Sequence, residues 1–316
     1  MVTFGQFFTE TYLPIAKINK SLESYNAEEI YFNKWIKPVI GKMPFKNIRP
    51  LNIERIKKDM LDAEKAPRTI QYVFAIIRQA WNMVRRDGLI NTKSPTKNVS
   101  LPKLKNKRLR FLTHKESDLL LEKIKSKSLK THNISLISLH CGLRAREIFK
   151  LTWGDIDFDR GIINVDGKGG KNRPAFMTDK IKKMLKGLKV GKPNDLIFPD
   201  RDGNQIKRIS NAFQRSVKDL GFNDNITDKR QKVVFHTLRH TFASWLVEDG
   251  TDLYAVQKLM GHSTISMTER YAHLSNGTLQ NAVKRLEKSI EKNTEPNDIA
   301  YKQEVIDGNG TKVIGP

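Results

Sequence analysis

The stretch 236–271, HTLRHTFASWLVEDGTDLYAVQKLMGHSTISMTERY, decides how the second half of this chain folds. Its apolar residues recur at the period of a helix, at Phe235, Leu238, Phe242, Trp245 and Leu246. His236, Arg239 and His240 are spaced i, i+3, i+4 and therefore share another face of the same helix. Two imidazoles and one guanidinium on one helix face predict an anion-binding surface.

The remainder of this stretch predicts a short second helix followed by a turn. Thr251 suits the N-cap of a helix over 253–260, and Gly261 suits the residue that ends it. His262 then falls in the turn, and Tyr271 follows nine residues later on a further helix. A solvated basic face and a packing tyrosine explain the same pattern, and the stretch taken alone favours this non-catalytic interpretation. The rest of the chain has to separate the two interpretations.

The composition favours a nucleic-acid-binding protein. The 316 residues include 57 Lys plus Arg against 34 Asp plus Glu, which gives a net charge of +23. A membrane surface is the competing polyanion, but no apolar run approaches the roughly 18 residues of a spanning helix. The N-terminus lacks the pattern of a signal peptide, so we expect a soluble, intracellular protein. Cys141 is the only cysteine, which excludes an internal disulfide and a thiolate metal site.

The first hundred residues predict a compact domain of four helices, over 3–17, 22–39, 50–64 and 67–87. In the fourth, the apolar residues follow the helical period at Ile70, Val73, Phe74, Ile77, Trp81 and Val84. The opposite face carries Arg68, Gln71, Arg78, Arg85 and Arg86. These side chains are suited to phosphates or base edges, although a solvated polar face is an equal alternative.

A basic connector follows this helical segment. Residues 91–110 contain two prolines and no acidic residue, and five of the eight residues from 103 to 110 are basic. Such a segment can follow a phosphate backbone without reading sequence. We expect a helical domain over 1–102, a linker over 103–112, a second domain over 113–290 and a C-terminal tail over 291–316.

The second domain contains two further candidate anion-binding groups. Arg144 follows a buried helix in the stretch CGLRAREI, where it is suited to hold an anion or to pair with Glu147 or Asp155. Strands over 162–165 and 173–177 predict a hairpin with a glycine-rich turn. Lys168 stands at its tip, where it either meets a phosphate or is simply solvated.

The segments CGLRAREI, GKGGKNR, HTLRHTFAS and LMGHSTISMTERYAHL, taken in this order, resemble the tyrosine recombinases, the phage integrase and Xer group. The resemblance covers nearly the whole chain, because the first hundred residues resemble the helical core-binding domain of that family. It implies a mainly α fold with a small β-hairpin or sheet, of the α+β class. A helical core-DNA-binding domain would precede a mixed α/β catalytic domain.

The resemblance also implies the catalytic residues, which are Arg144, Lys168, His236, Arg239, His262 and Tyr271. Tyr271 would attack a DNA phosphate and form a 3′-phosphotyrosine, with His236 as the provisional proton acceptor. Lys168, or its neighbour Lys171, would protonate the leaving 5′-oxygen. The two arginines and His262 would bind the non-bridging oxygens. His240 would have a structural or supporting role, and neither a metal nor another cofactor is expected.

The implied partner is double-stranded DNA, bound by a homotetramer on two synapsed duplexes. In free solution the protein would be a monomer. Accessory DNA-bending or directionality factors are further expected partners, and no membrane is. The protein would integrate or excise a phage or mobile element in the cytoplasm of a bacterial host, with the nucleoid. A type IB topoisomerase shares much of this chemistry, and a non-catalytic architectural DNA-binding protein would explain the charge. Both stay as alternatives at this point.

Overall fold

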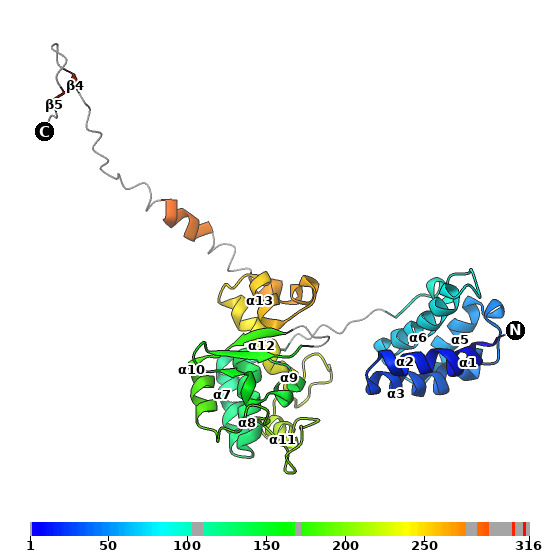
Figure 1. The fold of residues 1–316 in the computed structure, drawn as a ribbon, viewed down its shortest axis with the longest axis horizontal. Helices are drawn as coiled ribbons and strands as arrows, with labels where there is room; N and C mark the ends of the chain where they lie inside the picture. The colour runs from blue at the N-terminus through cyan, green and yellow to red at the C-terminus, as the bar shows by residue number, and fades with distance from the viewer. Residues whose placement is uncertain are drawn as a thin grey trace. The chain divides into compact units, whose positions relative to one another are not determined.

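The computed structural model describes residues 2–102, 110–167, 172–275, 283–290, 305–306 and 312–313. The chain divides into two compact units, residues 1–106 and 107–316. Figure 1 shows that the first unit is all helical and that the second combines helices with a small sheet. The predicted mainly α fold with a small sheet is therefore confirmed.

Four helical rods form the first unit, close to the four predicted helices. Two of them contain a π-helical segment, over Phe8–Tyr12 and Phe32–Ile36. The first rod contains α1 (Phe4–Phe7) and α2 (Leu13–Asn19), and the second contains α3 (Leu22–Tyr31) and α4 (Lys37–Ile40). The third and fourth rods are α5 (Pro50–Asp62) and α6 (Pro67–Arg86). The predicted apolar face of α6 is buried along its whole length.

Aromatic rings and one buried carboxylate hold these rods together. The rings of Phe8 and Phe32 stack with their centroids 4.0 Å apart, and burial of such large rings is a major source of stability. Glu28 is 2% exposed, so its charge needs partners within the protein. Lys20 Nζ donates to Glu28 Oε1 at 2.6 Å and to Gln79 Oε1 at 2.7 Å, which links α3 to α6.

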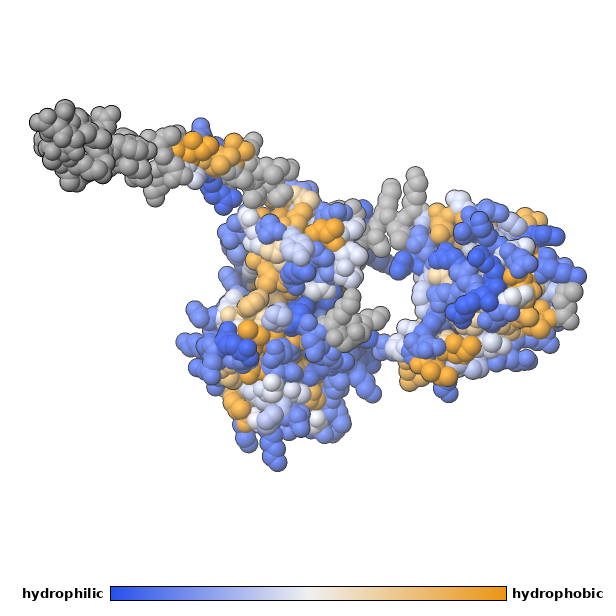
Figure 2. All heavy atoms as spheres, turned by 45° about the horizontal axis from the view of Figure 1, so that its top comes forward, coloured by the Kyte–Doolittle hydropathy of each residue, from blue (hydrophilic) through white to orange (hydrophobic). Residues whose placement is uncertain are grey.

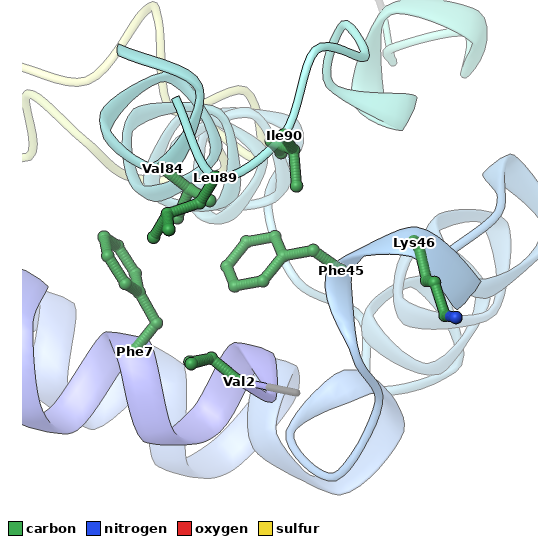
Figure 3. Close-up of a pocket in the computed structure, with 7 residues that line it drawn as sticks. All are labelled: Val2, Phe7, Phe45, Lys46, Val84, Leu89 and Ile90. Carbon is green, nitrogen blue, oxygen red and sulfur yellow. The ribbon is translucent and has the colours of Figure 1, made fainter. Parts of the chain in front are cut away.

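An apolar pocket of about 280 Å³ opens between α1 and the end of α6 (Figure 3). It is lined by Val2, Phe7, Phe45, Lys46, Val84, Leu89 and Ile90. Its walls carry one charged side chain, Lys46, and no acidic one. The pocket therefore has none of the convergent polar groups that orient a reacting ligand.

The second unit combines a group of helices with a three-stranded antiparallel sheet. Strands β1 (Ile156–Asp157), β2 (Ile162–Val165) and β3 (Arg173–Phe176) are neighbours in that order, and Val165 pairs with Arg173. The helices are α7 (His114–Lys125), α8 (Leu129–Cys141), α9 (Ala145–Lys150), α10 (Asp179–Lys186), α11 (Asn211–Asp219), α12 (Phe235–Glu248) and α13 (Leu253–Met260). A 3₁₀ helix over Glu269–Ser275 carries Tyr271, and residues 283–290 are also helical.

Helix α12 is embedded between two groups of neighbours. Leu238 belongs to the main core with α7 and α8, whereas Ala243 and Val247 pack with α13 and Tyr271 in a second cluster. The indole of Trp245 donates to the carbonyl of Leu112 at 3.0 Å. Because two sides of the helix are covered, α12 is buried over more of its circumference than a single apolar stripe predicts.

The predicted bounds of α13 are confirmed, but its predicted N-cap is wrong by one residue. The N-cap is Asp252 and not Thr251, because the carboxylate of Asp252 accepts from the backbone N–H groups of Tyr254 and Ala255 at 2.8 and 3.0 Å. An aspartate at this position also suits the positive end of the helix dipole. Gly261 ends α13 in the left-handed conformation, as predicted.

Gly142→Ala should destabilise the second unit more than the same substitution of a left-handed glycine that has open space around its Cβ position. A Cβ at Gly142 would lie 2.4 Å from Cδ1 of Phe242, and φ is +65°. Backbone strain costs about 1–2 kcal/mol and the clash about 1–3 kcal/mol more. The free energy of unfolding in urea measures the loss. The control is Gly161→Ala, with φ of +67° and open space around the Cβ. Equal losses for both variants would contradict the packing role of Gly142.

Candidate active site

Arg144 lies at the N-cap of α9, two residues after the glycine that ends α8. Its backbone N–H donates to Glu147 Oε2 at 2.8 Å, and its Nη1 donates to Glu147 Oε1 at 2.7 Å. The side chain is 37% exposed, so one edge of the guanidinium stays open to a ligand. The ion pair with Glu147 and the anion-binding role, which the sequence left as alternatives, are therefore compatible.

Arg239 is the buried counterpart on α12, with 1% exposure. Its Nη1 donates to the carbonyl of Gly142 and its Nη2 to the carbonyl of Met260, at the ends of α8 and α13. Both carbonyls lie at the negative ends of helix dipoles. Burial, the largest cause, and the nearby charge of Arg144 together lower the pKa of Arg239 to about 9, against the opposing effect of Glu147.

Glu147 joins a third arginine to this pair. Arg173, the first residue of β3, donates from Nη2 to Glu147 Oε2 at 3.0 Å, and Arg239 Nη1 lies 3.9 Å from the same oxygen. Burial alone would raise the pKa of Glu147, but Arg173 and the hydrogen bonds from Arg144 hold it below its ordinary value. The carboxylate is thus ionised, and it is the anchor shared by three guanidinium groups.

Arg173 also packs against the turn after α13. A Cβ at Gly261 would lie 2.2 Å from its Nε, so the arginine stem fills the space that a side chain there would need. Among the residues that the structure describes, its Nη1 is buried without a hydrogen-bond partner. No role was predicted from the sequence for Arg173 or, beyond its ion pair, for Glu147. The available signal was their place within GKGGKNR and CGLRAREI.

His262 follows the left-handed Gly261 at the edge of this cluster. Its Nδ1 lies 2.9 Å from Oγ1 of Thr268. Burial is the largest cause of a pKa lowered to about 3, and the charges of Arg239 and Arg144 act in the same direction. The imidazole is therefore neutral at physiological pH, suited to hydrogen bonding rather than to carrying charge.

Tyr271 is 5% exposed, and its hydroxyl lies 2.5 Å from Nδ1 of His240. Burial raises the pKa of the phenol to about 12, against the opposing charges of Arg270 and Arg239. His236 is exposed, and its ring meets that of His240 edge-on with centroids 4.7 Å apart. His240, for which only a supporting role was expected, is thus in direct contact with the hydroxyl.

The structure brings together Arg144, Arg239 and His262, and it gathers Tyr271 with two histidines of α12. Lys168 and its alternative Lys171 lie outside the described residues. Within the described ranges, no group of three or more His, Cys, Asp or Glu side chains has the arrangement of a metal site. The helices in those ranges are also too short or too polar to span a membrane.

Both units match known protein families. Residues 110–277 match the phage integrase family, and residues 3–61 match the phage integrase N-terminal SAM-like domain. The tyrosine recombinase XerD of Pseudomonas aeruginosa is 27% identical over 295 residues, which cover 87% of this chain and 93% of that protein.

Two solved structures share the fold. A Tn1549 transposon integrase in complex with a circular intermediate DNA has a TM-score of 0.73 at 21% identity, over 90% of this chain and 100% of that one. A lambda integrase tetramer bound to a Holliday junction has a TM-score of 0.65 at 18% identity, over 84% and 79%. The first family model covers more than half of the chain and every site residue named above, so the protein belongs to the phage integrase family of tyrosine recombinases.

Proposed function

We propose that this tyrosine recombinase cuts and rejoins DNA through Tyr271, with Arg144 and Arg239 binding the scissile phosphate. The arginine cluster around Glu147 is the observation that carries the proposal. Three guanidinium groups and one carboxylate leave an excess of two positive charges in a largely buried site. A phosphodiester carries one negative charge, and the transition state of attack on it carries more. The excess charge suits that growing charge on the non-bridging oxygens.

The proposed chemistry conserves the energy of the phosphodiester bond. The Tyr271 oxygen forms a bond to phosphorus, the bond to the 5′-oxygen breaks, and a 3′-phosphotyrosine results. Attack by a different 5′-hydroxyl then reverses the step and exchanges strands. His262 donates a hydrogen bond to the phosphate as a neutral imidazole. Lys168, or Lys171, protonates the leaving oxygen, a role that rests on the resemblance alone.

The proposed substrate is double-stranded DNA, held by a tetramer on two duplexes. The net charge of +23 supports a polyanionic partner, and the matched Tn1549 integrase was solved with DNA. A tetramer is supported by the lambda integrase assembly and by residues 283–290. Their Val283, Leu286 and Ile290 are 56–67% exposed and, at spacings of three and four residues, share one helix face. Figure 2 shows hydrophobic surface on this helix.

The proposed biological role is integration or excision of a phage or mobile element. This role requires bacterial chromosomal DNA, and hence a protein working at the nucleoid in the cytoplasm. Accessory DNA-bending or directionality factors would choose between the two directions. Neither topoisomerase activity nor a purely architectural role gains support from the matched proteins, which are recombinases and integrases.

Tyr271→Phe should abolish covalent attachment to DNA while leaving DNA binding intact, because only the nucleophilic oxygen is removed. The substrate is a nicked duplex carrying the recombination site, in which loss of a short strand traps the adduct. Denaturing electrophoresis measures the adduct, and a gel shift measures binding. The matched control is Tyr254→Phe, a 61% exposed tyrosine on α13, which should form adduct normally. Adduct formation by Tyr271→Phe would refute the assignment of the nucleophile.

Arg173→Met should slow adduct formation about 10- to 100-fold with little change in DNA affinity, because Glu147 loses one of its partners and its hold on Arg144 weakens. Arg173→Lys should recover part of the rate, since it keeps the charge. Single-turnover rates at saturating DNA separate this effect from binding. The control is Arg160→Met, which removes a 75% exposed arginine just before β2. Equal rates for Arg173→Met and Arg160→Met would exclude a positioning role.

A further inference from the structure

The hydroxyl of Tyr271 needs a group that removes its proton. A phenol with a pKa of about 12 is fully protonated at physiological pH, and the protonated oxygen is a weak nucleophile. At 5% exposure, the side chain is also screened from bulk water. The proton acceptor therefore has to be a protein group already in contact with the hydroxyl.

Nδ1 of His240 is in that contact, at 2.5 Å from the phenolic oxygen. The distance is at the short end of the range for hydrogen bonds in proteins. Both side chains are buried, with 7% exposure for His240, so the hydrogen bond is protected from competing water. Within such a contact, transfer of the proton needs no rearrangement of the two groups.

The surroundings favour the phenolate once the proton has moved. Arg239 from α12 and Arg270 from the 3₁₀ helix both act to lower the pKa of Tyr271. Next to His240, one turn earlier on α12, the exposed ring of His236 lies at a centroid distance of 4.7 Å. The two imidazoles therefore connect a buried hydroxyl to the surface. His236, which was expected from the sequence to accept the proton of Tyr271, is the exposed member of this pair of histidines.

We propose that His240 is a catalytic residue of the cleavage step and takes the proton of Tyr271 on Nδ1. This inference rests on the proposed function. As the tyrosine oxygen bonds to phosphorus, its proton moves to His240, and the bond from phosphorus to the 5′-oxygen breaks. The leaving oxygen takes a proton from a separate acid. In the reverse step, His240 returns the same proton to the departing phenolate.

Two substitutions separate proton transfer from simple positioning. His240→Asn keeps an amide group near the place of Nδ1, which accepts a hydrogen bond but does not take a proton. His240→Ala removes both functions. The expected result is a fall of about 10²- to 10⁴-fold in the single-turnover rate of adduct formation for both variants, with DNA affinity kept. His273→Gln is the matched control, because His273 is exposed on the same 3₁₀ helix as Tyr271. It should react like the wild type.

Each other outcome overturns the proposal in a recognisable way. A normal rate for His240→Asn with a slow rate for His240→Ala would mean that His240 only positions the phenol. Faster cleavage by either variant would mean that the contact restrains Tyr271 in a resting state. Unchanged rates in both would remove His240 from the reaction. If the wild type itself forms no Tyr271-dependent adduct on its site, the proposed function fails, independently of His240.

Discussion

The second unit depends on one buried cation, the guanidinium of Arg239. A charge with 1% exposure is costly to bury unless each donor finds an acceptor. Here the carbonyls of Gly142 and Met260 provide acceptors at the ends of α8 and α13, and Glu147 lies 3.9 Å away. Since Arg239 belongs to α12, the ends of α8 and α13 must meet this helix at one point, although α8 lies about a hundred residues earlier in the chain. A substitution that weakens the hydrogen bonds of Arg239 would therefore disturb α8, α12 and α13 together.

This constraint also sets the geometry of the active site. Arg144 follows Gly142 by two residues, and His262 follows Met260 by two residues. Gly142 and Gly261 are both left-handed, so each helix stops abruptly and the next side chains turn towards the guanidinium. The carbonyls that accept hydrogen bonds from Arg239 thus lie, along the chain, two residues before the side chains that would bind the phosphate. Stability of the fold and placement of the site come from the same hydrogen bonds.

The sequence was sufficient for features that depend on local spacing. The four helices of the first unit, the hairpin strands and the left-handed end of α13 follow from periodicity and glycine position. Contacts across long separations were not predictable. His240 and Tyr271 are 31 residues apart, and Glu147 and Arg173 are 26 apart. A helical period places His240 beside His236 but does not say which of them faces the tyrosine, since this depends on how the 3₁₀ helix packs on α12.

The arginine cluster around Glu147 carries more positive than negative charge. Arg144, Arg173 and Arg239 share one carboxylate, and Nη1 of Arg173 is buried with no acceptor in the described part of the chain. Mutual repulsion of the cations therefore opposes folding, and desolvation adds to that cost. A bound phosphate would offset the excess charge, so phosphate binding and stability of the second unit are thermodynamically linked. In the proposed reaction, the negative charge on the phosphate is greatest in the transition state. The arginine cluster would therefore stabilise the transition state more than the bound substrate.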